Sequence, residues 1–145
     1  MPTLARRRPR TPRQSPGRPR GKAQLSLAIR PARPDDLYGA SDGERIVGYA
    51  GVGPERDAEA PAGTGELYAL YVHPDSWGCG VGRALADAAV ADLQGNGCRA
   101  IWLWVLEANI RARHFYTRYG FTETGARTYS SLADLPEIRL TLPTG

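Results

Sequence analysis

A glycine-rich loop between an apolar segment and an alanine-rich segment constrains the fold of this chain more than any other feature. The stretch His73–Ala89 reads HPDSWGCGVGRALADAA, with glycines at positions 78, 80 and 82. The preceding residues, Glu66–Val72, are rich in aromatic and aliphatic side chains and predict a strand. The following apolar residues recur at helical spacing, and Asn96-Gly97 predicts the end of that helix; they are Val81, Leu85, Ala88, Ala89 and Leu93.

A strand that turns through glycines into a helix presents backbone N–H groups at the positive end of the helix dipole. Such a loop can bind phosphate or pyrophosphate, and Arg83 could add a charged contact. A Walker loop is excluded because no Gly-Lys-Ser/Thr follows. A dinucleotide fingerprint starting at Gly78 would need glycine at position 83, and no acidic residue lies at the expected distance downstream. The alternative is a turn that only lets strand and helix pack closely.

The rest of the chain predicts further strands and one more helix. We expect a first strand over Leu25–Arg30, ended by Pro31 and Pro34, and then two strands flanking an Asp42-Gly43 turn. Residues Pro54–Gly65 predict a polar loop. The continuously apolar Ala100–Leu106 is typical of a strand covered on both faces. In this strand Trp102 and Trp104 belong to the core or, alternatively, to the wall of a binding pocket.

The second helix is predicted over Ile110–Tyr119, with Asn109 as N-cap and Gly120 as C-terminal cap. Its apolar stripe consists of Ala112, Phe115, Tyr116 and Tyr119. Residues 121–129 and 137–142 predict the final strands. We therefore expect an α/β (α+β) fold, with a mixed, mostly antiparallel central sheet and flanking helices.

The positive charge of the chain is concentrated at one end. Residues 1–23 carry eight Lys or Arg and no acid, whereas the remaining 122 residues carry 11 basic and 15 acidic residues. The first segment also mixes Arg with Pro, Gly and Ser, so we expect a basic disordered tail over 1–23 and one folded domain over 24–145. Such a tail can bind nucleic acid through charge, but a solvated extension is the preferred interpretation.

Composition also narrows the class of protein. Two cysteines and two histidines provide no disulfide framework and no metal-ligand spacing, so we expect no metal. No apolar stretch has the length of a signal-peptide core or a membrane span. We expect a cytoplasmic protein with no membrane partner.

Two separated motifs together resemble the GNAT superfamily of N-acetyltransferases, which use acetyl-CoA. The first is the segment ELYALYVHPDSWGCGVGRAL, and the second is LEANIRARHFYTRYGF further along the chain. The resemblance is strongest over Glu66–Gly125. It implies a GNAT-like fold in which the loop from Trp77 to Arg83 holds the CoA pyrophosphate, through Trp77, Gly78, Cys79, Gly80, Val81, Gly82 and Arg83. Trp77 replaces the usual Gln or Arg, which removes a side-chain contact and leaves the backbone contacts.

The resemblance also implies roles for residues outside the loop. The backbone of Leu70, Tyr71 and Val72 would bind the pantetheine arm as an added strand would. Asn109, Ala112 and Phe115 in the second motif would contact the cofactor, and Asn109 could also serve as N-cap. No metal is implied.

The resemblance implies two catalytic residues. Glu66 falls where histone-type relatives place the base that takes the acceptor's proton; the alternative is a solvated carboxylate at the strand end. Tyr116 corresponds to the family's general acid for the CoA thiolate, and the alternative is a core aromatic, a role that we expect Phe115 to fill.

One part of the family pattern is missing. The family inserts two acceptor-side helices between the first strand and the hairpin, so this chain resembles an N-terminally abbreviated member. A partner subunit in a homodimer or an unusual loop replaces that wall, or acyl transfer is impaired. The leading hypothesis is transfer of acetyl from acetyl-CoA to a primary amine of a small molecule or peptide. The alternatives are an impaired CoA-binding module and a nucleic-acid-associated protein acting through the tail.

Overall fold

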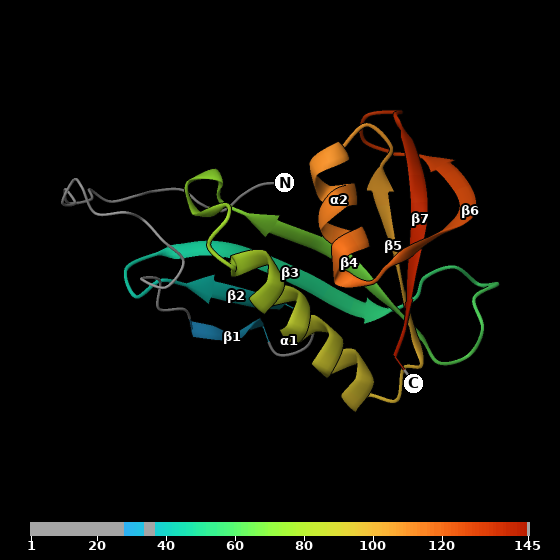
Figure 1. Ribbon diagram of the computed structural model, residues 1–145. Helices are drawn as coiled ribbons and strands as arrows, with labels where there is room; N and C mark the ends of the chain where they lie inside the picture. The colour runs from blue at the N-terminus through green and yellow to red at the C-terminus, as the bar shows by residue number, and fades with distance from the viewer. Residues whose placement is uncertain (1–27, 34–36, 145) are drawn as a thin grey trace. The chain divides into compact units, whose positions relative to one another are not determined.

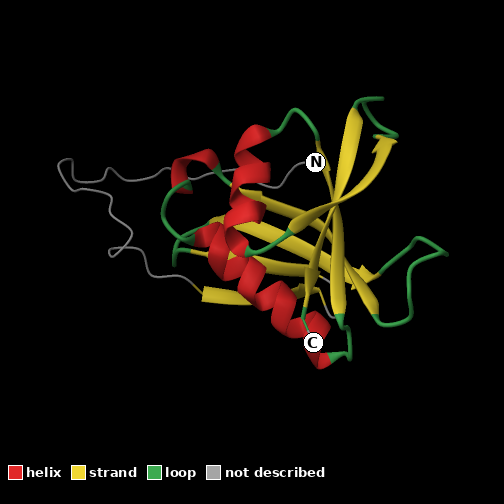
Figure 2. Ribbon diagram, turned by 45° about the vertical axis from the view of Figure 1, so that its right-hand side comes forward, coloured by secondary structure: helices red, strands yellow, loops and turns green. Residues whose placement is uncertain are grey.

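The computed structural model describes residues 28–33 and 37–144, and the expected tail over 1–23 lies outside these residues. The strands and the two α-helices follow the order that the sequence predicts, and a short 3-10 turn that was not predicted precedes the first of these helices (Figures 1 and 2). The elements are β1 (Ala28–Arg33), β2 (Leu37–Ser41), β3 (Ile46–Pro54), β4 (Thr64–Val72), η2 (Pro74–Ser76), α1 (Val81–Gly95), β5 (Ala100–Leu106), α2 (Ile110–Tyr119), β6 (Thr122–Tyr129) and β7 (Pro136–Pro143).

The described strands form one seven-stranded sheet in the order β1-β2-β3-β4-β5-β7-β6. The pairs β1/β2, β5/β7 and β6/β7 are antiparallel, and β4/β5 is parallel. This mixed, mostly antiparallel sheet confirms the expected fold class. Only residues 34–36 separate β1 from β2, so the two helices expected of a full-length family member have no room between these strands.

The first strand differs from its predicted bounds. It continues through Pro31 to Arg33 instead of ending at Pro31, and its residues 25–27 lie outside the described part of the chain. A proline is tolerated here because β1 is an edge strand, and its pairing with β2 shifts register between Pro31 and Arg33. The strand β4 likewise begins at Thr64, two residues before the predicted start at Glu66.

The contacts between residues divide the chain into two compact units. Unit 1 is Met1–Ala50 with Leu70–Ala88, and unit 2 is Gly51–Ala69 with Ala89–Gly145. In unit 1 the expected turn between β2 and β3 spans four residues, 42–45, because the Asp42 carboxylate accepts hydrogen bonds from the N–H groups of Glu44 and Arg45. The buried core residues of this unit include Ala40, Val47, Ala50, Val81, Leu85 and Ala86.

Unit 2 contains β5, α2, β6 and β7, and Figure 1 shows α2 beside β5. The expectation that both faces of β5 are covered is wrong. Burial alternates along the strand, with Ile101, Leu103 and Val105 buried, while Trp102 and Trp104 are half-buried on the opposite face. This alternation is the ordinary period of two, and it leaves the tryptophan face of the sheet without a covering helix in this unit.

The helix α2 packs its aromatic side chains differently from the prediction. Tyr116 is the buried aromatic of this helix, and Phe115, which we expected in the core, is half-buried. The Tyr116 ring meets Phe115 and Phe121 edge-on, with centroid distances of 5.3 and 5.5 Å. The caps are as predicted: Asn109 accepts from the Ala112 N–H, and Gly120 has a φ of 128°.

Candidate functional site

In unit 1 the glycine loop connects the end of β4 to α1 through η2. Gly78 and Gly80 have φ angles of 78° and 87°, which L-residues with side chains rarely adopt. A Cβ added at either position would meet no atom within 4 Å, so the space beside the backbone is open there. The third glycine, Gly82, lies inside α1. Two of the three glycines are therefore required by backbone conformation.

The start of α1 supplies N–H groups to this loop. The first helical bond runs from the Ala84 N–H to the Gly80 carbonyl, so the N–H groups of Val81 and Gly82 have no partner within the helix. No acidic side chain lies in the first turn. The Arg83 guanidinium pairs with Asp87 at 3.6 Å, and both side chains are exposed. The loop therefore has the backbone chemistry of an anion site.

Trp77 and Cys79 contribute to the loop in different ways. The Trp77 indole N–H donates to the Val72 carbonyl at 3.0 Å and so ties the loop to the end of β4. The Cys79 N–H donates to the Ser76 carbonyl at 3.3 Å, and its thiol is half-buried. Trp77 therefore holds the loop in place instead of reaching outward as the usual Gln or Arg would.

The last residues of β4 lie close to β3. Gly48 of β3 comes so near that an added Cβ would lie 2.6 Å from the Tyr71 carbonyl oxygen. The Tyr71 ring packs on Tyr49 at a centroid distance of 5.6 Å. Burial, followed by repulsion from Tyr71, raises the pKa of Tyr49. Leu70 and Val72 are half-buried, so the strand end expected to bind pantetheine is well fixed in unit 1.

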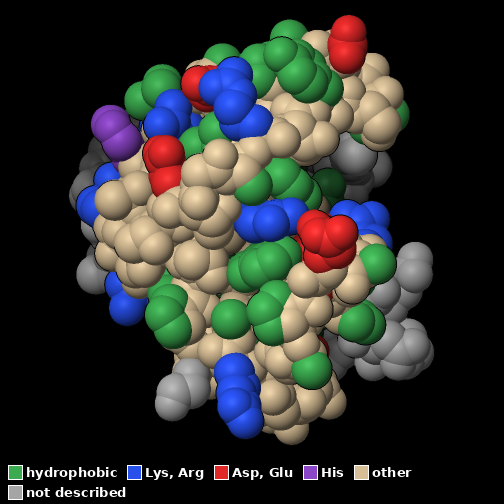
Figure 3. Space-filling model, turned by 90° about the vertical axis from the view of Figure 1, so that its right-hand side faces the viewer, with side chains coloured by type: hydrophobic (Ala, Val, Ile, Leu, Met, Phe, Trp, Pro, Cys, Tyr) green, Lys and Arg blue, Asp and Glu red, His purple; other side chains and the backbone are tan. Residues whose placement is uncertain are grey.

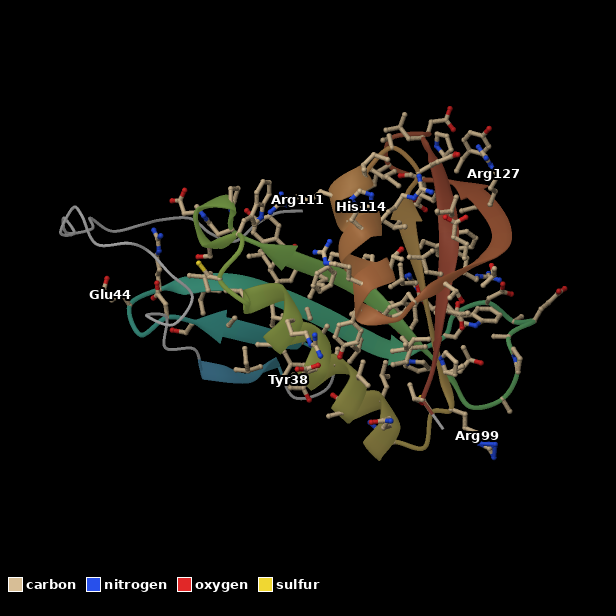
Figure 4. All side chains as sticks on the ribbon, in the orientation of Figure 1. Tyr38, Glu44, Arg99, Arg111, His114 and Arg127 are labelled. Carbon is tan, nitrogen blue, oxygen red and sulfur yellow. The ribbon has the colours of Figure 1, made fainter. Side chains whose placement is uncertain are left out.

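In unit 2 the second motif forms the whole of α2 and the residues that cap it. The Asn109 side-chain oxygen accepts from the Ala112 N–H at 3.1 Å, which leaves its NH2 group as a donor. Ala112 and Phe115 are half-buried on the same helix. Figure 4 labels Arg111 and His114 on α2, and both side chains are exposed.

Tyr116 is 7% exposed, and burial raises the pKa of its phenol above the ordinary value. A phenol with a raised pKa stays protonated at neutral pH and remains a hydrogen-bond donor. Burial therefore fits both readings of this residue, the core aromatic and the general acid.

Glu66 is neither solvated nor isolated. Its side chain is 4% exposed and is held by Arg56, whose own side chain is 71% exposed. The Arg56 Nε and Nη2 donate to the two carboxylate oxygens at 3.0 and 2.9 Å, and the Arg56 backbone N–H adds a bond of 3.3 Å. The alternative interpretation of Glu66, a solvated carboxylate at the strand end, is wrong, because the loop after β3 folds back over Glu66.

Sequence reasoning missed the arginine that faces the tryptophans of β5. The Arg139 guanidinium lies over the Trp102 ring at 4.0 Å and the Trp104 ring at 4.6 Å. It also donates to Asp57 at 2.9 Å. Residues 55–63 are here called the β3–β4 loop, and two ion pairs hold this loop to the sheet. Figure 3 shows basic, acidic and hydrophobic side chains side by side on the face toward β6 and β7. The adjacent opposite charges of Arg56 and Asp57 were the sequence signal from which ion pairs of this loop could have been predicted.

Among residues 28–33 and 37–144, no group of three His, Cys, Asp or Glu side chains is placed to hold a metal ion. No helix in the same part of the chain is both long and apolar enough to span a membrane. His73 serves the loop after β4, where its Nδ1 accepts from the Asp75 N–H at 3.1 Å.

Comparisons with known proteins agree with the motifs. A mycothiol acetyltransferase of Geodermatophilus obscurus is 42% identical over 91 residues, which are 61% of this chain and 29% of that protein. Among solved structures, a GNAT-family protein from Desulfovibrio desulfuricans is 28% identical with a TM-score of 0.64, over 75% of this chain and 69% of that one. A Salmonella typhimurium acetyltransferase solved with acetyl-CoA has the same fold, with 22% identity and a TM-score of 0.63, over 75% of this chain and 64% of that one.

The chain therefore spans less than a third of the mycothiol acetyltransferase that it matches. The model of the acetyltransferase (GNAT) family matches residues 4–121, well over half of the sequence. On this match, and with the strand, glycine loop and helix order described above, the chain belongs to the GNAT acetyltransferase family.

Proposed function

We propose that this chain transfers an acetyl group from acetyl-CoA to a primary amine. The observation that carries the proposal is the glycine loop before α1, with Gly78 and Gly80 in the left-handed region and open space beside them. Family membership and the acetyl-CoA in the Salmonella structure support the choice of donor. The match covers less than a third of the mycothiol acetyltransferase, so we do not assign the substrate of that protein to this chain.

The loop would bind the pyrophosphate of CoA mainly through its backbone. The N–H groups at the start of α1 and the helix dipole favour a negative charge there, and a side chain at positions 78 or 80 would hold the anion away. Trp77 donates to Val72 and is not needed as a phosphate ligand. The backbone of Leu70–Val72, in the same unit as the glycine loop, would hold the pantetheine arm.

The proposed reaction needs one base and one acid. The amine nitrogen attacks the thioester carbonyl carbon, the new C–N bond replaces the C–S bond, and the amine loses a proton. We assign that proton to Glu66, directly or through water, and the proton for the CoA sulfur to Tyr116. A thiol has an ordinary pKa of about 8.5, so a protonated phenol beside the leaving sulfur stabilises its developing charge.

The β3–β4 loop supports one of the explanations for the missing acceptor-side helices. Arg56 and Asp57 attach this loop to Glu66 and Arg139, beside the half-buried Trp102 and Trp104. We propose that it forms part of the acceptor wall that the two helices form in a full-length family member. An unusual loop then replaces this part of the wall.

Calorimetry with CoA and thiol release with a panel of small amines, peptides and aminoglycosides test the proposal. We expect CoA binding and CoA-dependent thiol release with at least one amine. CoA binding without turnover of any amine on the panel would favour a CoA-binding module. Absent CoA binding would exclude both acetyl transfer and a CoA-binding module.

The assignment of Tyr116 predicts that Tyr116→Phe lowers kcat by about 10²-fold, the usual size of a general acid contribution, with little change in CoA affinity. Tyr119→Phe is the matched control, since this half-buried tyrosine on the same helix has no assigned role. Full turnover of Tyr116→Phe would contradict the assignment. An unchanged pH–rate profile in Glu66→Gln would remove Glu66 as the base.

A further inference from the structure

The ion pair between Arg56 and Glu66 joins one exposed and one buried partner. The Arg56 side chain is 71% exposed, and the Glu66 side chain is 4% exposed. A buried carboxylate is costly without a cation, whereas an exposed guanidinium leaves for water at little cost. The buried acid therefore needs a cation at this position, but that cation need not be Arg56.

The surroundings of Glu66 are built for a flat or compact cation. Arg56 lies 4.5 Å over the Tyr68 ring, and the Tyr68 hydroxyl donates to the Pro54 carbonyl at 2.8 Å. Gly53 leaves room for this ring, since an added Cβ there would lie 2.9 Å from its Cζ. Trp102 is the register partner of Glu66 across β4 and β5, so the two side chains share a face of the sheet. A carboxylate and aromatic rings together favour an ammonium or guanidinium group.

A second ion pair holds the β3–β4 loop independently of Arg56. Arg139 is 13% exposed at its side chain, lies over both tryptophans and donates to Asp57 at 2.9 Å. The Arg139 side chain is much less exposed than the Arg56 side chain, although Asp57 is more exposed than Glu66. The loop can therefore stay attached through Asp57 while Arg56 leaves the carboxylate.

We propose that Arg56 occupies the place of a cationic group of the acceptor, which displaces Arg56 from Glu66 when it binds. The subsite consists of the Glu66 carboxylate and the Tyr68 ring, with Trp102 on the same face, and it takes a primary ammonium or a guanidinium. The identification of this cation with the acetyl acceptor rests on the proposed function. The existence of the cation subsite does not.

The test is a binding titration without acetyl-CoA, followed by the fluorescence of the tryptophans on this face. The probes are n-butylammonium and methylguanidinium, with 1-butanol as the neutral control. We expect Arg56→Ala to bind both cations about fivefold more tightly than the wild type, because an exposed competing ion pair has been removed. The double variant Arg56→Ala with Glu66→Gln should lose this gain, and 1-butanol should show none.

Two further variants keep the test decisive. Arg56→Lys retains a competing cation and should bind as the wild type does. Arg127→Ala removes an arginine from another ion pair of the same unit, with Glu107, and should also leave binding unchanged. If Arg56→Ala does not fold by circular dichroism, Arg56→Gln replaces it. Equal affinity in the wild type and in the folded neutral variant, Arg56→Ala or Arg56→Gln, or a gain that persists with Glu66→Gln, overturns the proposal.

Calorimetry with CoA on the same preparations separates this inference from the proposed function. Absent CoA binding together with a gain in cation affinity would refute acetyl transfer and keep the cation subsite. Normal CoA binding and turnover without that gain would refute the subsite alone.

Discussion

Two loops of this molecule follow neighbouring strands, and they are built in different ways. The glycine loop after β4 is shaped mainly by backbone: two positive φ angles, a 3-10 turn and hydrogen bonds between main-chain groups. The side chains of Trp77 and His73 each add one hydrogen bond to a main-chain group. The β3–β4 loop is shaped by side chains, with Arg56 bound to Glu66 and Asp57 bound to Arg139. The first loop suits an anionic cofactor, and the second surrounds a carboxylate that requires a cation.

The difference teaches which kind of site a sequence reveals. A backbone site leaves its mark in one short stretch, because only glycine adopts the required φ at low cost. A side-chain site is assembled from residues far apart, such as Asp57 and Arg139, which are 82 positions apart. Substitutions in the glycine loop should therefore change cofactor affinity. Substitutions in the β3–β4 loop should change stability and acceptor binding.

The largest effect is expected from Arg139→Ala. This substitution removes a guanidinium from two tryptophan rings, so we expect the free energy of unfolding to fall by about 2 kcal/mol. Asp57 also loses its cation, but this carboxylate is partly exposed, so its loss adds little. Urea unfolding gives the free energy, and the near-ultraviolet circular dichroism of the tryptophans should change.

Arg127→Ala is the control for that experiment. Its pair with Glu107 is partly exposed on both sides, so the loss should be below about 1 kcal/mol. An equal loss of unfolding free energy in the two variants would show that Arg139 stabilises the β3–β4 loop no more than an exposed ion pair would. The CoA affinity should remain unchanged in both.

The second prediction concerns the glycine loop. Gly80→Ala should cost about 1–2 kcal/mol in strain, since the φ of 87° disfavours an L-residue although the added Cβ meets no atom. A loop that relaxes to relieve this strain binds CoA about tenfold more weakly, as calorimetry would show. Gly95→Ala is the matched control, because Gly95 ends α1 without a positive φ or a close neighbour. Similar CoA affinity in both variants would argue against a backbone-built cofactor site.

The sequence predicted the elements well where the local signal was complete. The bounds of β5 and α2 were predicted correctly, because an uninterrupted apolar run and a pair of caps mark them. Burial was harder to predict. Apolar composition alone could not show that one face of β5 is covered by Arg139 instead of a helix. Likewise, spacing places Phe115 and Tyr116 on adjacent parts of α2, and only packing shows that Tyr116 is the buried one.

Some residues of the candidate site could be predicted from the sequence, and others could not. The glycines at 78 and 80 and the cap at Asn109 could be identified from neighbours within three residues. The state of Glu66 could not, because its partner Arg56 lies ten residues away across a loop whose path no local rule determines. Pro31 was misjudged for a related reason, since its tolerance depends on the edge position of β1.

The third prediction uses pH to compare the charges of the β3–β4 loop. The hydrogen bond from the Glu59 N–H and then the one from Arg139 lower the pKa of Asp57 below its ordinary 3.8. A lowered folded-state pKa means that this stabilisation is present above the unfolded-state pKa and is lost as pH falls through the folded-state value. The stability difference between the wild type and Asp57→Asn, from urea unfolding, should therefore shrink in acid.

Glu55 provides a control of opposite sign. Burial raises the pKa of this carboxyl, so its contribution is present at low pH and is lost as pH rises through the raised value. Glu55→Gln should gain stability relative to the wild type as pH rises toward neutrality. The same pH trend in both variants would mean that the two carboxylates do not differ as the contacts indicate.

The smallest effect is expected from removing residues 1–23. The segment carries eight basic residues, whereas the expected cofactor contacts all lie between Leu70 and Tyr116. At about 0.15 M salt, where exposed charges are screened beyond about 8 Å, the truncated chain should bind CoA with unchanged Kd by calorimetry. At low salt the full chain should bind slightly more tightly, because its positive charge attracts the anionic cofactor. A loss of affinity on truncation that persists at high salt would instead place part of the cofactor site in this segment, and the glycine loop would no longer account for binding alone.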